Sequence, residues 1–138
     1  MDKKVFDGLK VLLVEEEALI AMDIEQFCYD LGAARVATIS SLAKLSQEAL
    51  DSVGAQAQML DTDVAILDAK VGGEWTADLA RRLTGLKVPF VFATGYSGGE
   101  AFFEEFPDVP VVLKPYAGDQ LISAILTAIE RTRLEHGG

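Results

Sequence analysis

Four short apolar segments place the strongest constraint on the fold of this chain, because each has the pattern of a strand buried on both faces. They span residues 10–14, 63–68, 88–93 and 109–113, and a weaker strand is predicted over 35–39. Segments with apolar residues at helical spacing separate them. This alternation of strands and helices predicts a parallel sheet with helices on both faces.

The first half of the chain predicts two helices. Apolar residues at spacings of four, three and four define one helix over 17–31: Ile20, Ile24, Phe27 and Leu31. Gly32 follows it as a C-cap. The serine pair at 40–41 is suited to cap a second helix over 42–52. Residues 53–62 are predicted to form a polar connection to the next strand.

The second half predicts three more helices. The last one, over 117–134, carries five apolar residues on one broad face: Leu121, Ile122, Ile125, Leu126 and Ile129. A glycine turn at 72–73 precedes a helix with a predicted buried stripe of Trp75, Leu79 and Leu83. Between the glycine-rich segment 95–99 and Pro107 there is room for about two helical turns, so the fourth helix is predicted to be short or mobile.

These elements fit an α/β fold of the flavodoxin-like, doubly wound type, with a five-stranded parallel sheet in the order 2-1-3-4-5. In such a sheet, ligands bind at the carboxyl ends of the strands, where the strand order reverses. Here that point lies between the first and third strands. The length of 138 residues fits a single domain.

The composition excludes several classes of partner. Twelve basic against twenty-two acidic residues give a net charge of -10, which argues against binding to nucleic acid or to an anionic membrane. Cys28 is the only cysteine, so we expect a buried thiol in a reducing compartment. The sequence has neither a signal-peptide pattern nor an apolar run of membrane-spanning length, so we expect a cytoplasmic protein.

Chemically useful side chains follow four of the predicted strands. The first strand is followed by Glu15 and Glu16, the third ends at Asp68, and the fourth and fifth are followed by Thr94 and Lys114. Because the carboxyl ends of parallel strands line one crevice, we expect these groups to lie together. Acids, a hydroxyl and an amine at one point indicate phosphoryl chemistry on a metal ion.

Together, the acidic pair, the Asp, the Thr and the Lys-Pro resemble the receiver domain of two-component response regulators. The resemblance covers about 8–134 of a single domain spanning 1–138, with a short disordered tail expected after 135. The stretch 89–96, Pro-Phe-Val-Phe-Ala-Thr-Gly-Tyr, is similar to the FATGUY subfamily of receivers. Members of this subfamily are typically stand-alone proteins that work with histidine kinases of the HWE or related types.

The resemblance implies a phosphoacceptor signalling domain, not an enzyme, although it would assist its own phosphorylation and dephosphorylation. Asp68 would take a phosphoryl group from a phosphohistidine of a sensor histidine kinase, while Thr94 and Lys114 would hold the phosphoryl oxygens. A histidine phosphotransferase or another downstream protein would be a further partner. The implied cofactor is Mg²⁺, with Mn²⁺ as an alternative. Its site would be formed by Glu16, Asp68 and the backbone carbonyl of Lys70 as direct ligands, with Glu15 acting through water.

The chain departs from the family pattern at two places, and two alternatives stay open. Both residues of the acidic pair are Glu, where receivers usually have at least one Asp, and Val112 occupies the position of an aromatic switch residue. No effector domain follows, so output is expected through the domain's own surface. One alternative is a degenerate receiver that binds proteins independently of phosphorylation. The other is a Mg-dependent phosphohydrolase with an Asp nucleophile, which usually needs a second acid where Lys70 stands.

Overall fold

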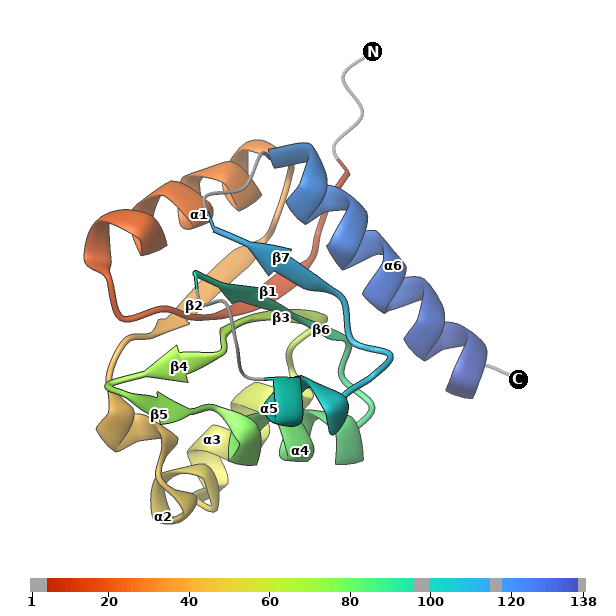
Figure 1. Cartoon of the computed structure of the whole chain (residues 1–138). Coiled ribbons are helices and arrows are strands. Elements are labelled where there is room, and N and C mark those ends of the chain that lie inside the picture. Colours follow the sequence, from red (N-terminus) through yellow and green to blue (C-terminus); the bar gives the residue numbers. More distant parts are fainter. Residues whose placement is uncertain (1–4, 96–99, 115–117, 137–138) are drawn as a thin grey trace.

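The computed structural model describes residues 5–95, 100–114 and 118–136. Its centre is a five-stranded parallel sheet in the order β2-β1-β3-β6-β7 (Figure 1). The strands are β1 (Lys10–Val14), β2 (Arg35–Ile39), β3 (Val64–Asp68), β6 (Phe90–Thr94) and β7 (Val111–Leu113). Numbered within this sheet alone, the order is 2-1-3-4-5, so the predicted fold class is confirmed.

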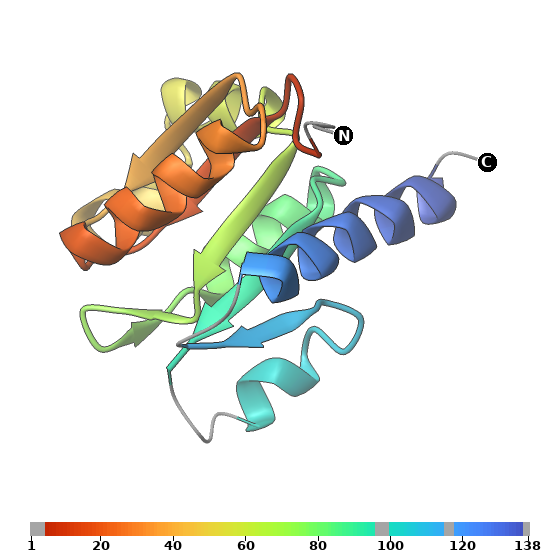
Figure 2. The same cartoon turned by 90° about the horizontal axis from the view of Figure 1, so that it is seen from above.

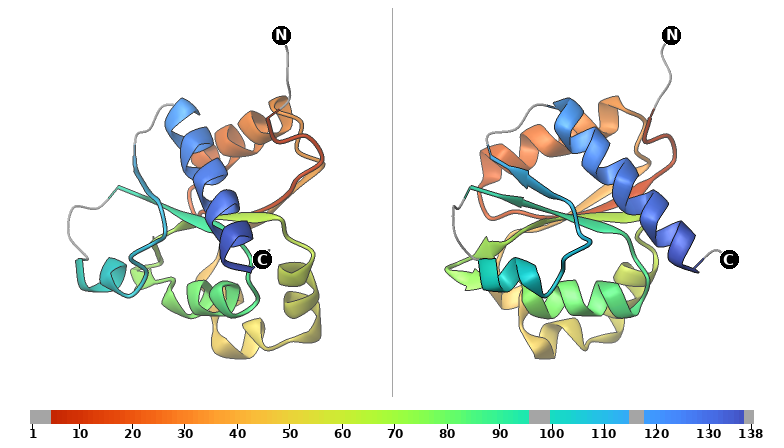
Figure 3. Two further views of the ribbon diagram at one scale, coloured as in Figure 1. Left: turned by 90° about the vertical axis from the view of Figure 1, so that its right-hand side faces the viewer. Right: turned by 45° about the vertical axis from the view of Figure 1, so that its right-hand side comes forward.

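Helices cover both faces of the sheet, as Figure 1 and Figure 3 show. The helices α1 (Ala18–Asp30) and α6 (Gly118–His136) lie on one face. The other face carries the 3-10 helix η1 (Leu42–Leu45) and four α-helices: α2 (Gln47–Leu50), α3 (Val53–Leu60), α4 (Ala77–Gly85) and α5 (Glu100–Glu104). The fourth major helix of the predicted pattern is α5, whose five residues confirm that it is short.

Each face of the sheet has its own buried core, because successive residues of a strand point to opposite faces. The core on the side of α2 to α5 includes Leu12, Leu67 and Phe92. The core on the side of α1 and α6 includes Val11, Ile66 and Val91. Burial on both faces explains why β3 and β6 are apolar without alternation.

The single cysteine lies in the core under α1 and α6. Cys28 is fully buried, as predicted. Burial raises the pKa of its thiol to about 11, and the neighbouring charge of Glu25 adds to the rise. The thiol therefore remains protonated throughout the neutral range.

A small hairpin that the sequence did not predict connects β3 to α4. Its strands are β4 (Lys70–Val71) and β5 (Glu74–Trp75), and it projects past the carboxyl end of β3 (Figure 2). Gly72 and Gly73 form its two-residue turn at positive φ angles of 59° and 82°, which glycine adopts without strain. The prediction that Trp75 belongs to the buried helical stripe is wrong, because Trp75 lies in β5 and is 37% exposed.

The segment between β2 and β3 also differs from the prediction. The expected helix over 42–52 is broken at Ser46 into η1 and α2, and the expected polar connection over 53–62 is mostly the helix α3. Ser46 and Ser52 cap α2 and α3 by accepting the amides of the residues three positions on, whereas the predicted cap Ser41 makes no such bond. Because each of these two serines begins a new helix, the segment forms η1, α2 and α3 instead of one long helix.

The remaining predictions for the helices need smaller corrections. Leu126 does not belong to the buried face of α6, because it is 43% exposed. α6 continues to His136, so the chain is still helical where the tail was expected to begin. Of the glycine-rich segment 95–99, the residues 96–99 lie outside the described part of the chain. No helix among residues 5–95, 100–114 and 118–136 is both long and apolar enough to span a membrane.

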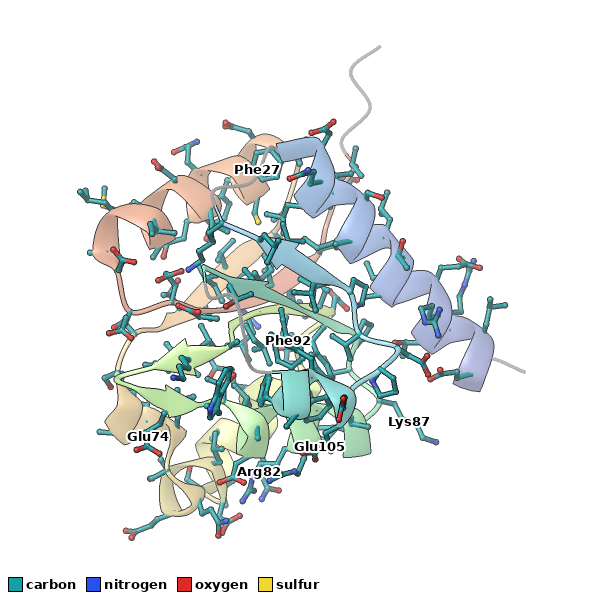
Figure 4. The ribbon with its side chains drawn as sticks, viewed as in Figure 1. Phe27, Glu74, Arg82, Lys87, Phe92 and Glu105 are labelled. Atoms are coloured by element: carbon teal, nitrogen blue, oxygen red, sulfur yellow. The ribbon has the colours of Figure 1, made fainter. Side chains whose placement is uncertain are left out.

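The first turn of α6 approaches α1 closely at a glycine. A Cβ atom on Gly118 would lie 2.7 Å from Cε1 and 2.9 Å from Cζ of Phe27, so close that the ring or the helix would have to shift. Phe27 projects from α1 toward α6 in Figure 4. Gly118 thus permits the contact between the two helices on this face.

We predict that Gly118→Ala lowers the free energy of unfolding by about 1–3 kcal/mol, because the added methyl group forces the Phe27 ring or α6 to move. Gly85→Ala is the matched control. It lies in α4 with no atom within 4 Å of the added Cβ, so stability should be unchanged or higher by up to about 1 kcal/mol. Urea denaturation measures both values, and equal effects would contradict the packing argument.

Candidate functional site

Three charged side chains from distant parts of the sequence meet at the carboxyl edge of the sheet. Lys114, directly after β7, places its Nζ 2.5 Å from Glu15 Oε1 and 3.3 Å from Asp68 Oδ2. The two carboxylate residues are almost buried, with 1% of Glu15 and 7% of Asp68 exposed. Neighbouring β1 and β3 supply the acids, so the cluster lies where the strand order reverses.

The electrostatics of this cluster are dominated by burial. Loss of solvent raises the pKa of the Asp68 carboxyl to about 6; Lys114 opposes the rise, and Glu15 adds to it. Burial alone would lower the pKa of the Lys114 ammonium, but hydrogen bonds and charge from Glu15 and Asp68 outweigh it, so that pKa is raised. One ammonium therefore balances two carboxylates only in part, and a further cation would be favoured here.

The two glutamates that follow β1 have different partners. Glu15 uses both oxygens within the protein, because Oε1 accepts from Lys114 Nζ and Oε2 accepts from the amide of Glu17 at 3.1 Å. Glu16 is exposed, and its Oε1 accepts from the amide of Gly72 at 2.7 Å. Within the described residues, Glu16 Oε2 has no hydrogen-bond or ion-pair partner.

The loop after Asp68 is held by a residue that the sequence analysis did not identify. The buried Thr76 donates its hydroxyl to the carbonyls of Asp68 (2.9 Å) and Ala69 (3.2 Å), and its amide also donates to Ala69. The amide of Lys70 donates to the Asp68 carboxylate. A Thr before a helix would be read as a cap, but Thr76 makes no side-chain cap bond, so its role could not be inferred locally.

The end of β6 sets the position of Lys114. The amide of Lys114 donates to the carbonyl of Thr94 at 2.7 Å, which continues the ladder between β6 and β7. The Thr94 side chain is fully buried at this edge, and Val112 is buried in β7. The predicted site residues therefore share one edge of the sheet, and ion pairs with Lys114 join Glu15 and Asp68 within it.

The donors at this edge are suited to a hard divalent cation, although they are not preassembled. Within the described residues, no three carboxylate, imidazole or thiol side chains are grouped so that they could hold a metal ion. Carboxylate and carbonyl oxygens are the ligands that Mg²⁺ prefers, usually with several waters retained. Burial is the main cause of the raised pKa of Asp68, and a further positive charge at this edge would act against that rise, as Lys114 does.

Comparisons with known proteins give matches in structure only. No protein-family model matches the chain, and no curated protein matches it. SdrG from Sphingomonas melonis Fr1 shares 35% identity with it, covering 88% of this chain and 97% of that one with a TM-score of 0.68. A response regulator receiver protein from Sinorhizobium medicae WSM419 shares 26% identity, covering 91% and 97% with a TM-score of 0.71.

A response regulator receiver domain protein from Clostridium thermocellum matches in fold, with a TM-score of 0.72, 24% identity and coverage of 92% of this chain and 98% of that one. These likenesses extend over nearly the whole length of each protein. They agree with the strand order of the sheet and with the resemblance of the motifs at its carboxyl edge. The chain therefore has the fold of response regulator receiver domains.

Proposed function

We propose that this receiver accepts a phosphoryl group on Asp68 from the phosphohistidine of a sensor histidine kinase. The observation that carries the proposal is the Lys114 ammonium 3.3 Å from the Asp68 carboxylate. This ion pair lies at the carboxyl edge of the sheet, where β1 and β3 end and the strand order reverses. A receiver with this arrangement signals, or relays the group to a histidine phosphotransferase or another downstream protein, through its own surface.

The transfer forms one bond and breaks another. A carboxylate oxygen of Asp68 attacks the phosphorus, which creates an acyl phosphate. The P–N bond to the kinase imidazole breaks, and the imidazole nitrogen keeps the electron pair and takes up a proton. Lys114 supplies a fixed positive charge for the phosphoryl oxygens, and we assign Thr94 to a second of these oxygens.

We further propose that the site takes Mg²⁺, with Mn²⁺ as an alternative. The bound ion would offset the negative charge of the carboxylates and of the incoming phosphoryl group. We assign its ligands to Asp68, to Oε2 of Glu16 and to the backbone carbonyl of Lys70. Glu15 already bonds Lys114 and the Glu17 amide, so we assign it an indirect role through water.

The stretch 89–96 supports a place in the FATGUY subfamily and therefore a kinase of the HWE or a related type as the partner. Its last residue, Tyr96, lies outside the described part of the chain. A cytoplasmic location follows from such a partner. The competing function is a receiver that binds proteins independently of phosphorylation, and it is favoured by Glu16, which bonds the Gly72 amide instead of joining the cluster.

We predict that acetyl phosphate with Mg²⁺ adds one phosphoryl group to the wild-type protein and none to Asp68→Asn. Intact-protein mass spectrometry measures the increment, and circular dichroism confirms that the variant is folded. If the folded wild type gains no phosphoryl group from acetyl phosphate or from a histidine kinase, the phosphorylation-independent function is the better account.

Millimolar Mg²⁺ is predicted to stabilise the protein by relieving the repulsion among the acids. At about tenfold excess over its dissociation constant, the ion adds roughly 1.4 kcal/mol to the free energy of unfolding. Glu16→Gln should remove most of the gain. Glu17→Gln is the matched control, because Glu17 is an exposed neighbour that we do not assign to the ion. Thermal unfolding measures all three proteins, and equal gains would place the ion elsewhere.

The raised pKa of Asp68 predicts how the stability of the metal-free protein depends on pH. Because the folded pKa, about 6, exceeds the ordinary value of 3.8, Asp68 destabilises the fold increasingly as pH rises from 3.8 to about 6, and by a constant amount at higher pH. The advantage of Asp68→Asn over wild type in unfolding free energy should therefore grow across this interval and level off at about pH 7. We expect a growth of roughly 1–2 kcal/mol, after allowance for partial solvation.

Asp61→Asn is a control of opposite sign for this pH dependence. Hydrogen bonds from Arg35 and Lys10 lower the pKa of Asp61, so its contribution to stability is present at neutral pH and is lost in acid. Urea denaturation in EDTA at several pH values measures both variants. If the difference in unfolding free energy between Asp68→Asn and wild type does not change with pH, the argument that burial destabilises the charged Asp68 carboxylate is wrong.

A further inference from the structure

The hairpin of β4 and β5 is the element that joins the candidate site to α5. We propose that the stacked rings of Trp75 and Phe102 position this hairpin for cation binding, so that Trp75 and Phe102 are positioning residues of the site. The inference rests on the proposed function, because it concerns the cation assigned to Asp68 and Glu16. It assigns a role to an exposed tryptophan and to a short helix that do not touch the ion themselves.

The hairpin holds both carboxylates through its own backbone. The amide of Lys70 donates to Asp68, and two residues later the amide of Gly72 donates to Glu16 at 2.7 Å. The carbonyl assigned to the ion also belongs to Lys70. A displacement of the hairpin would therefore move all three proposed protein ligands relative to one another.

The opposite strand of the hairpin contacts α5. Trp75 pairs with Lys70 across the hairpin, and the Lys70 ammonium lies 4.7 Å from the centre of the indole ring. The indole stacks on Phe102 with ring centres 4.6 Å apart and an interplanar angle of 23°. Phe103 meets the same indole edge-on at 6.4 Å.

The helix that receives Trp75 is anchored in turn to the sheet and to α4. Phe102 and Phe103 pack against Phe92 of β6. In Figure 4, Phe92 lies between the sheet and α5. Glu105, just after α5, accepts two hydrogen bonds from Arg81 of α4, at 2.5 Å and 2.9 Å. A five-residue helix and a hairpin with two residues in each strand are both marginal alone, so each depends on such contacts.

This geometry gives a physical route between the site and α5 that does not use Val112. If the stack favours the hairpin position that binds the cation, then the bound cation must favour the stack to the same extent. A cation bound at the site would thus stabilise the contact between the indole ring of Trp75 and α5. Trp75 is suited to this task because it is partly exposed and can move without opening a core.

The first test compares two identical substitutions within one aromatic cluster. Phe102→Leu removes the partner of Trp75, whereas Phe106→Leu removes a ring that packs on Phe90, Phe92 and Phe102 but not on Trp75. Calorimetric titration with Mg²⁺ should show about three- to tenfold weaker binding for Phe102→Leu. Phe106→Leu should bind within about twofold of wild type although it also lowers thermal stability.

Substitutions at Trp75 provide a second pair that does not threaten folding, because this residue is 37% exposed. Trp75→Leu should weaken Mg²⁺ binding as Phe102→Leu does, and Trp75→Phe, which keeps an aromatic ring, should restore most of the affinity. A metal-free measurement accompanies both pairs. The amide of Gly72 should exchange faster with solvent in Phe102→Leu than in wild type, and at the wild-type rate in Phe106→Leu.

The outcomes separate this inference from the proposed function. If wild type binds Mg²⁺ and Asp68 is phosphorylated, but Phe102→Leu and Phe106→Leu behave alike, the positioning role is overturned and the function stands. If wild type neither binds Mg²⁺ nor gains a phosphoryl group, both proposals fail together. Weaker binding and faster Gly72 exchange in Phe102→Leu alone would support the inference.

Discussion

A single ammonium group shared by two buried carboxylates is the interaction on which the functional edge of this protein depends. Lys114 bonds both Glu15 and Asp68, although burial disfavours all three charges. Removal of the ammonium would leave two acids facing each other with little solvent between them. The same imbalance, two negative charges against one positive charge, is the electrostatic basis of the cation and of the phosphoryl transfer that we propose for this edge.

The sheet makes this shared interaction possible. Parallel pairing brings the ends of β1, β3 and β7 to the same edge, although their residues are far apart in sequence. The bond from the Lys114 amide to Thr94 continues the ladder beyond the strand and directs the lysine inward. Thr76 fixes the backbone after Asp68 from the other side. The backbone at this edge is thus held by the sheet ladder and by the hydroxyl of Thr76, and it positions the charged side chains.

The sequence sufficed for β1, β3, β6 and β7 because each is an apolar run too short for a buried helix, with a polar residue at its end, whereas β2 gave a weaker signal. It failed where the local signals were weak or misleading. The helix α3 buries only Met59 and contains Gly54, so its sequence lacks the apolar stripe that predicts a helix. Trp75 stands four residues before Leu79 and mimicked a helical stripe. The meeting of Asp68 with Lys114 followed from topology, but the separate partners of Glu15 and Glu16 depend on the hairpin and could not be foreseen.

The buried thiol described above has a consequence for chemical selectivity. A thiolate is intrinsically a stronger nucleophile than a carboxylate. Cys28, however, is enclosed in the core under α1 and keeps its proton at neutral pH. Electrophiles in the surrounding solution therefore do not meet a reactive thiolate at Cys28. The fold thus keeps the thiol of Cys28 away from solvent, so this thiol does not compete with Asp68 in the phosphoryl transfer that we propose.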